Sequence, residues 1–128
     1  MSKPFHVWFD ATELVNETYN IFDIARNTGE IKIGTIETTR ALEKRKAKLI
    51  IIAEDTDPPE VVAHLPYFCE DIKVPYTYVP SKHLLGEKCG FDYLVAAVAI
   101  TDLGKASDLY KSFLDKLEKV KKERKIEH

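Results

Sequence analysis

Apolar residues recur at a spacing of three and four in two stretches of the chain, residues 13–27 and residues 105–122. This spacing places the apolar side chains on one face of a helix, so each stretch is predicted to be an amphipathic helix. In the first stretch the apolar positions are Leu14, Val15, Tyr19, Ile21, Phe22, Ile24 and Ala25. Gly29 is expected to end that helix, because glycine readily adopts the left-handed conformation found at helix ends.

Short, unbroken apolar runs predict strands. The clearest run is residues 48–53, which is typical of a strand buried on both faces. Residues 74–79 and 96–100 are expected to be strands for the same reason, and residues 31–33 a shorter one. Helices and strands therefore alternate at short intervals. We expect a single α/β domain over residues 1–128, a three-layer α/β/α sandwich around a small mixed four-stranded sheet.

Two further helix starts are marked by hydroxyl residues, whose oxygen can accept a bond from a free backbone N–H. Thr35 is expected to cap a helix that runs to about Lys46, with Glu37 in its positively polarised first turn. Ser81 is expected to cap a short helix that ends at Gly90.

Acids and prolines gather after the strand predicted at residues 48–53. Asp57 is expected to cap a helix with Pro58 at its first position, and Pro66 to bend or restart that helix. Glu54, Asp55 and Asp57 together are candidates for binding a hard cation. A helix cap with solvated loop acids explains the same residues more simply, so we expect no metal site.

The charge balance restricts the kind of partner. The formal net charge is −2 and the sequence pI is about 6.1, which argues against a chain-wide electrostatic grip on nucleic acid. An RNA partner would therefore have to meet a local basic patch. No apolar run reaches the roughly 18 residues of a membrane span, and the N-terminus is unlike a signal peptide, so we expect a cytoplasmic protein without a membrane partner.

Signals of catalysis are weak. Cys69 and Cys89 lack metal-binding or redox spacing and are expected to be two reduced, partly buried thiols. His64 has no partner at a spacing diagnostic of a catalytic base, and no glycine-rich phosphate loop is present. We therefore expect neither catalytic residues nor a cofactor.

The segment from Lys32 to Arg40 carries the most informative chemistry. A strand end, Gly34 and a helix start follow one another, and free backbone N–H groups at a helix start can hold a phosphate. Glu37 and Arg40 are three apart and project from one side of the first turn. A carboxylate can accept from base amino groups, and arginine can donate to the O6/N7 edge of guanine. Further cations nearby are Lys44 and Arg45. A solvated helix with an ion pair would explain the same residues.

This segment, which reads KIGTIETTR, resembles the signature KKGTNETTK of the archaeal L7Ae ribosomal proteins, a family that binds RNA kink-turns. The resemblance covers nearly the whole chain. Other stretches that carry it are Ala47–Ala53, Glu54–Asp71, Val74–Lys82, Leu85–Gly90 and Ala96–Ile100. It implies an α/β/α sandwich that binds a kink-turn in ribosomal or guide RNA, beside the proteins of the same particle. The family is usually monomeric on RNA, so the free chain is expected to be a monomer.

The resemblance also implies roles for individual residues. Glu37 and Arg40 match the residues that meet guanines of tandem sheared G·A pairs, and Lys32 and Thr35 match the part that contacts the RNA backbone. A second loop of the family covers flipped-out bases with apolar side chains, which suits stacking on unpaired bases. The expected RNA-binding residues are Lys32, Gly34, Thr35, Ile36, Glu37, Arg40, Lys44, Phe91, Tyr93, Leu94 and Val95. For Phe91 and Tyr93, packing in the core is an equal alternative.

Two positions depart from the signature. Ile36 replaces an asparagine whose amide bonds a base, and Ile33 replaces a lysine that contacts a phosphate. The two isoleucines are expected to expose apolar surface on the RNA face and, with Trp8, to mark a patch that meets protein. The alternative function is therefore a divergent paralogue with weakened RNA reading that acts as a ribosome-associated or protein–protein adaptor. Arg40 in place of lysine is a milder change, because arginine still reaches guanine.

Overall fold

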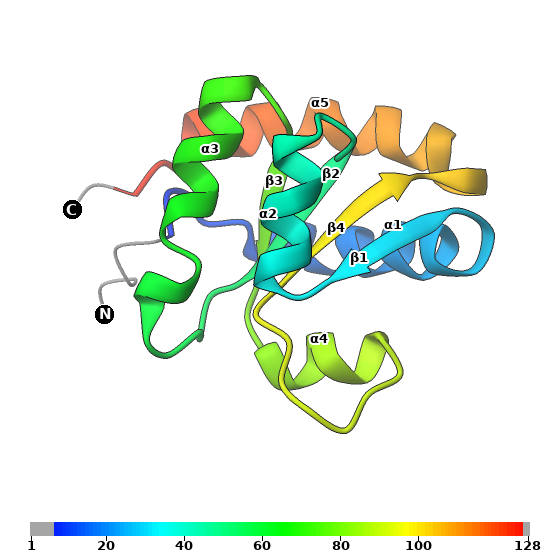
Figure 1. Ribbon diagram of the computed structural model, residues 1–128. Helices are drawn as coiled ribbons and strands as arrows, with labels where there is room; N and C mark the ends of the chain where they lie inside the picture. Colours follow the sequence, from blue (N-terminus) through cyan, green and yellow to red (C-terminus); the bar gives the residue numbers. More distant parts are fainter. Residues whose placement is uncertain (1–6, 127–128) are drawn as a thin grey trace.

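A four-stranded sheet with the strand order β1-β4-β2-β3 forms the centre of the molecule (Figure 1). The computed structural model describes residues 7–126. Its strands are β1 (Glu30–Ile33), β2 (Leu49–Ala53), β3 (Tyr76–Val79) and β4 (Ala97–Asp102). Its α-helices are α1 (Val15–Thr28), α2 (Thr35–Glu43), α3 (His64–Ile72), α4 (Lys82–Lys88) and α5 (Ser107–Glu123). Short 3₁₀ helices precede α1, α3 and α5: η1 (Thr12–Leu14), η2 (Pro59–Val61) and η3 (Gly104–Ala106).

The sheet is mixed, as predicted. β4 pairs antiparallel with both β1 and β2, and β2 pairs parallel with β3. All five residues of β2 are buried, which confirms that the unbroken apolar run is a central strand. Within the described residues, no helix has the length and apolar character needed to cross a bilayer.

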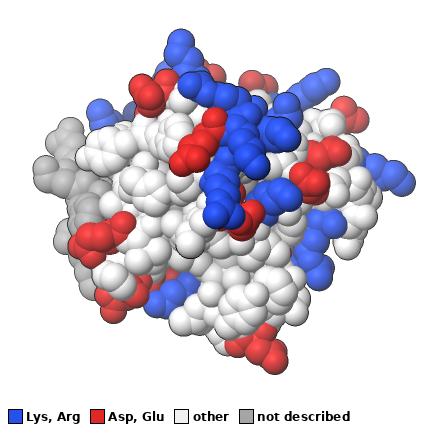
Figure 2. Space-filling model, viewed as in Figure 1, with Lys and Arg blue, Asp and Glu red and all other residues white. Residues whose placement is uncertain are grey.

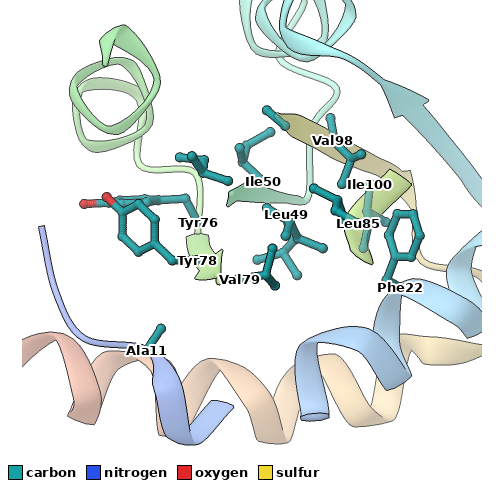
Figure 3. Packing of buried hydrophobic residues seen from close by; sticks show 14 of the residues in the cluster. Ala11, Phe22, Leu49, Ile50, Tyr76, Tyr78, Val79, Leu85, Val98 and Ile100 are labelled. Atoms are coloured by element: carbon teal, nitrogen blue, oxygen red, sulfur yellow. The ribbon is translucent and has the colours of Figure 1, made fainter. Parts of the chain in front are cut away.

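Helices cover both faces of the sheet. α2 and α3 lie on one face, and α1 and α5 lie on the other (Figures 1 and 3). Alternate strand residues point to opposite faces, so Ile50 packs toward the layer of α2 and α3, whereas Leu49, Val79 and Val98 pack toward the opposite layer (Figure 3). The predicted α/β/α sandwich is therefore confirmed. α4 stands apart from these layers, at the end of the sheet where β4 begins (Figure 1).

Gly29 ends α1 for a different reason from the one predicted. Its φ is −126°, so it is not left-handed. A Cβ at Gly29 would overlap the backbone carbonyl of Asp102, which passes directly against it. The glycine is required by the close approach of two backbones and not by its own dihedral angles.

The start of α2 also differs from the prediction. Gly34, with φ 100° and ψ 159°, occupies the cap position, and Thr35 is the first helical residue. The Gly34 N–H donates to the Ala97 carbonyl at 2.9 Å, so Gly34 still belongs to the sheet when the chain turns. The prediction that Thr35 caps the helix was therefore wrong. The helix ends at Glu43, before the expected Lys46.

The helix predicted at Asp57 was misplaced. Pro58 is extended, with ψ 147°, and a 3₁₀ turn begins only at Pro59, without a side-chain cap. A residue that precedes a proline is forced out of the helical region, so Pro58 cannot begin a helix. α3 starts separately at His64, and Pro66 lies in its first turn, where proline is tolerated. The Ser81 cap is confirmed, because its hydroxyl accepts from the Leu84 N–H at 3.0 Å.

Candidate nucleic-acid interface

α2 presents an arginine and a carboxylate together, with Glu37 in its first turn and Arg40 one turn further along. Arg40 Nη1 donates to Glu37 Oε1 at 2.8 Å, and the two side chains are 61% and 45% exposed. Spacing of three along the helix places both on one side, as predicted. The pair is open to solvent, so a guanine edge can reach both groups.

Beside this pair lies a hollow of about 240 Å³ between α2 and the β1–β4 edge of the sheet. It is lined by Glu30, Lys32, Glu37, Arg40, Ala41, Lys44, Lys46 and Thr101. Four of these side chains are cationic and two are acidic, so the hollow carries excess positive charge. Figure 2 shows Lys and Arg gathered over α2, with acidic side chains among them. This local basic patch is what an acidic chain needs in order to attract phosphate.

Strand alternation decides where the residues of β1 point. Lys32 reaches the hollow, whereas Ile31 and Ile33 are partly buried and pack against the core. The expectation that Ile33 exposes apolar surface was therefore wrong. The sequence did not indicate that Glu30, Lys46 and Thr101 line the hollow. Thr101 lies there because β4 pairs antiparallel with β1, and a pairing between distant segments cannot be predicted from the spacing of residues in either one.

The second predicted segment, residues 91–95, forms an apolar loop between α4 and β4. The rings of Phe91 and Tyr93 stack, with centroids 4.6 Å apart and an interplanar angle of 11°. Tyr93 is 60% exposed and Leu94 is 55% exposed, while Phe91 is half-buried against the core. Val95 is only 3% exposed, so its side chain packs in the core and not on the binding surface as expected.

Backbone bonds hold this loop in place. Phe91 N donates to Gly86 O at 3.0 Å, and Val95 N donates to Lys82 O at 3.1 Å. Because Gly34 is bonded to Ala97 just beyond the loop, the loop and the start of α2 are neighbours. Ile36, in the first turn of α2, is 69% exposed. The candidate surface therefore combines a charged half with an apolar half.

The other residues considered from the sequence lie elsewhere. Asp55 accepts from the Lys82 N–H at 2.8 Å and so ties the β2 end to α4. Across residues 7–126 no group of three or more potential ligands is placed to hold a metal. His64 contacts α2, with Nε2 lying 2.9 Å from Thr39 Oγ1. Trp8 lines a separate cavity and does not extend the apolar half.

Both cysteines are free and buried, more deeply than the partly buried thiols expected from the sequence. Burial raises the pKa of the Cys69 thiol to about 12 and that of Cys89 to about 11. Neither thiol is therefore a reactive thiolate near neutral pH.

Comparison with known proteins adds two findings. Residues 16–110 match the sequence model of the ribosomal protein L7Ae/L30e/S12e/Gadd45 family. The fold is similar to that of a solved structure, the Giardia lamblia 15.5kD RNA binding protein, with a TM-score of 0.80 and 32% sequence identity. The match covers 91% of this chain and 98% of that one.

Proposed function

The chain belongs to the ribosomal protein L7Ae/L30e/S12e/Gadd45 family. We propose that it binds RNA, recognises a kink-turn with Glu37 and Arg40 of α2, and does not catalyse a reaction. The observation that carries the proposal is the solvent-open Glu37–Arg40 pair beside a hollow with excess positive charge. The particle we propose is the large ribosomal subunit or a guide-RNA ribonucleoprotein.

The charged half of the surface suits the guanines of tandem G·A pairs. The Arg40 guanidinium can donate to the O6/N7 edge of guanine, and the Glu37 carboxylate can accept from a base amino group. Their mutual ion pair places the two side chains next to each other on α2. Lys32 and Lys44, at the hollow, are positioned for the phosphates that flank these bases.

The apolar half suits bases that leave the stack. Tyr93 and Leu94 offer an exposed ring and an aliphatic side chain next to the start of α2. Base–aromatic contact tolerates any base, because every base has a π face. We therefore propose that Glu37 and Arg40 supply sequence discrimination, while the loop supplies affinity for unpaired bases.

The test is binding of the full chain to a kink-turn RNA and to the same RNA with its tandem G·A pairs mutated. We expect nanomolar-range binding to the first and a large loss with the second. Absence of an RNA-dependent shift at micromolar protein would rule the proposal out.

A second function is favoured by one observation, the 69% exposure of Ile36 where the family signature has asparagine. An exposed isoleucine in the first turn of α2 adds apolar surface and replaces an amide that bonds a base in the family signature. In this case the chain is a divergent adaptor that docks on protein and reads RNA weakly. Kink-turn binding that is absent from the natural chain and created by Ile33→Lys with Ile36→Asn would favour the adaptor over the RNA reader.

A further inference from the structure

A cavity of about 870 Å³ lies among the N-terminal segment, β3, α3 and α5. It is lined by Trp8, Phe9, Tyr67, Glu70, Tyr76, Glu118, Lys121, Lys122, Lys125 and Ile126. Four of these residues are aromatic and three are lysines. The size is within the range of small-molecule and cofactor sites, and none of the residues belongs to the surface built by α2 and the apolar loop.

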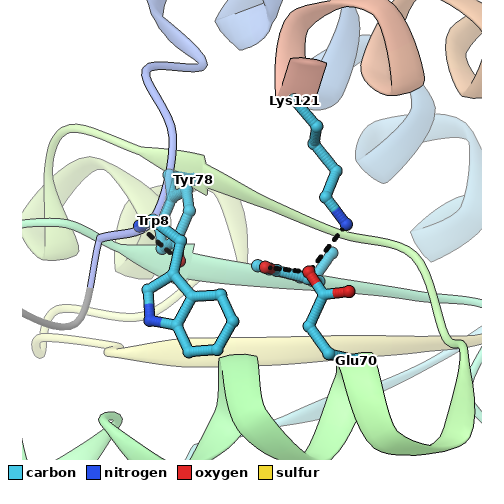
Figure 4. Close-up of polar contacts among 5 residues, drawn as sticks. Trp8, Glu70, Tyr78 and Lys121 are labelled. Carbon is cyan, nitrogen blue, oxygen red and sulfur yellow. Dashed lines mark hydrogen bonds and ion pairs between the residues drawn. The ribbon is translucent and has the colours of Figure 1, made fainter. Parts of the chain in front are cut away.

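The Trp8 and Tyr67 rings on one side of the cavity are held in place but remain accessible to solvent. The Trp8 and Tyr67 rings meet edge to face, with centroids 4.7 Å apart and an interplanar angle of 85°. The Trp8 backbone N–H donates to the Tyr78 hydroxyl at 3.1 Å, which fixes the chain at this point (Figure 4). Tyr67 is nevertheless 66% exposed, and Trp8 is only partly buried. Ring surface is therefore available to a flat ligand.

The charges of the cavity do not cancel. Lys121 donates to Glu70 at 2.8 Å, on the far side of the cavity from Trp8, and these two neutralise each other (Figure 4). Lys122 lies 3.7 Å from Glu118, a loose pair with both side chains largely exposed. Lys125 forms no ion pair with any residue of the described chain. The charge left over at the rim is positive.

We propose that this cavity binds an unpaired nucleotide of an RNA strand, with the base stacked on the exposed Tyr67 ring beside Trp8 and the phosphate at Lys122 and Lys125. Aromatic rings beside lysines are the combination that single-stranded nucleic acid requires, because rings stack with bases and lysines neutralise the backbone. The inference rests on the proposed RNA-binding function, and it adds a second contact to RNA that emerges from the folded motif as a single strand.

A purely apolar ligand fits less well, because it would leave the lysine rim unmatched. An acidic peptide would satisfy the lysines, and its aromatic residues would meet the same rings. The nucleotide is favoured because one repeating unit of RNA, a flat base joined to a phosphate, matches both the aromatic rings and the lysines of the cavity.

The experiment uses Trp8 as its own reporter, since it is the only tryptophan of the chain. The full chain is titrated with a short single-stranded RNA that contains no kink-turn, and tryptophan fluorescence is followed. We expect saturable quenching. Tyr67→Ala should weaken the apparent affinity by at least about fivefold, the lower bound for loss of one stacked base. Lys125→Ala should weaken it less and flatten its salt dependence.

Matched controls are Leu109→Ala, an exposed apolar residue of α5 away from the cavity, and Lys111→Ala, an exposed lysine of the same helix. Neither should change the titration. Lack of quenching, or quenching that Tyr67→Ala leaves unchanged, would overturn the inference. Quenching by an acidic aromatic peptide but not by RNA would overturn it in favour of a protein partner.

Failure here is separable from failure of the proposed function. A kink-turn hairpin without single-stranded extensions should bind Tyr67→Ala as tightly as the natural chain, whereas Arg40→Ala should weaken that hairpin and leave Trp8 quenching intact. Kink-turn binding without quenching contradicts only the cavity, and quenching without kink-turn binding contradicts only the reading by α2.

Discussion

The hydroxyl of Tyr76 donates a 2.6 Å hydrogen bond to Glu70 Oε2, the same oxygen that accepts from the Lys121 ammonium at 2.8 Å. Burial by itself would raise the pKa of the Glu70 carboxyl. The bonds from Lys121 and Tyr76 favour the ionised form more strongly, so the pKa lies below its ordinary value of 4.5. Three elements, β3, α3 and α5, are thereby joined through one carboxylate.

A carboxyl whose pKa is lowered by folding stabilises the native state above its unfolded pKa, and this contribution is lost as the pH falls through the folded value. Glu70→Gln keeps an acceptor for Tyr76 but removes the charge. We expect the variant to be less stable than the natural chain at pH 7, by under about 1 kcal/mol because the pair is partly exposed. The difference should shrink from about pH 5 downward. Urea unfolding at pH 7 and at pH 3 measures it; a constant difference at both values would contradict this account.

Ile36→Asn should strengthen kink-turn binding. The substitution restores an amide that can pair with a base edge, and one bidentate contact contributes about 1–3 kcal/mol, or roughly 5- to 150-fold in affinity. Because the isoleucine is 69% exposed, little core packing is lost. Leu109→Asn on α5 is the matched control, since it also replaces an exposed apolar residue. Equal affinities for the natural chain and Ile36→Asn would show that this position does not limit RNA reading.

Arg40 and Lys44 should differ in the kind of binding they support. Loss of a base contact should reduce discrimination, so Arg40→Ala should narrow the affinity gap between intact and G·A-mutated kink-turns by roughly 5- to 150-fold. Lys44→Ala should instead weaken both RNAs alike and reduce the slope of log K against log salt by about one. Both effects are measured by RNA titrations at several salt concentrations. If Arg40→Ala weakened both RNAs equally, its proposed contact with guanine would be excluded.

Gly34 and Thr35 provide a test of how α2 begins. A Cβ at Gly34 would meet nothing within 4 Å, but φ of 100° and ψ of 159° is a conformation almost restricted to glycine. Gly34→Ala should therefore destabilise the fold by about 1–3 kcal/mol through backbone strain alone. Thr35→Ala should cost less than about 0.5 kcal/mol, because the Thr35 side chain does not cap the helix. Thermal or urea unfolding of both variants measures these changes in the free energy of unfolding. A loss near 1 kcal/mol for Thr35→Ala would show that the Thr35 side chain does cap the helix.

Predictions from the sequence were correct for features that a few neighbouring residues determine. β2 followed from an unbroken apolar run, and the α4 cap followed from Ser81. The Glu37–Arg40 pair followed from helical spacing alone. These are local features, so they do not depend on which elements become neighbours.

Predictions were wrong where contact with another element, distant in the sequence, determines the local structure. Gly29 is required because the backbone of Asp102, far along the chain, passes against it. Gly34 begins α2 while its N–H is still hydrogen-bonded to Ala97 in the sheet. The family resemblance placed Val95 and Ile33 at the surface. Val95, in the loop before β4, is instead buried in the core, and Ile33, in β1, packs against the core. The lysine-rimmed cavity at Trp8 joins residues from both ends of the described chain, and no local pattern indicates it.

The apolar loop crosses α4 so closely that a Cβ at Gly86 would overlap the Tyr93 carbonyl. Its two ends are also bonded to α4, so the loop is attached to that helix along its length. A preformed surface spends little conformational entropy on association. Substitutions at Tyr93 or Leu94 should therefore change how long a complex survives, measured as its dissociation rate, and leave the rate of encounter nearly constant.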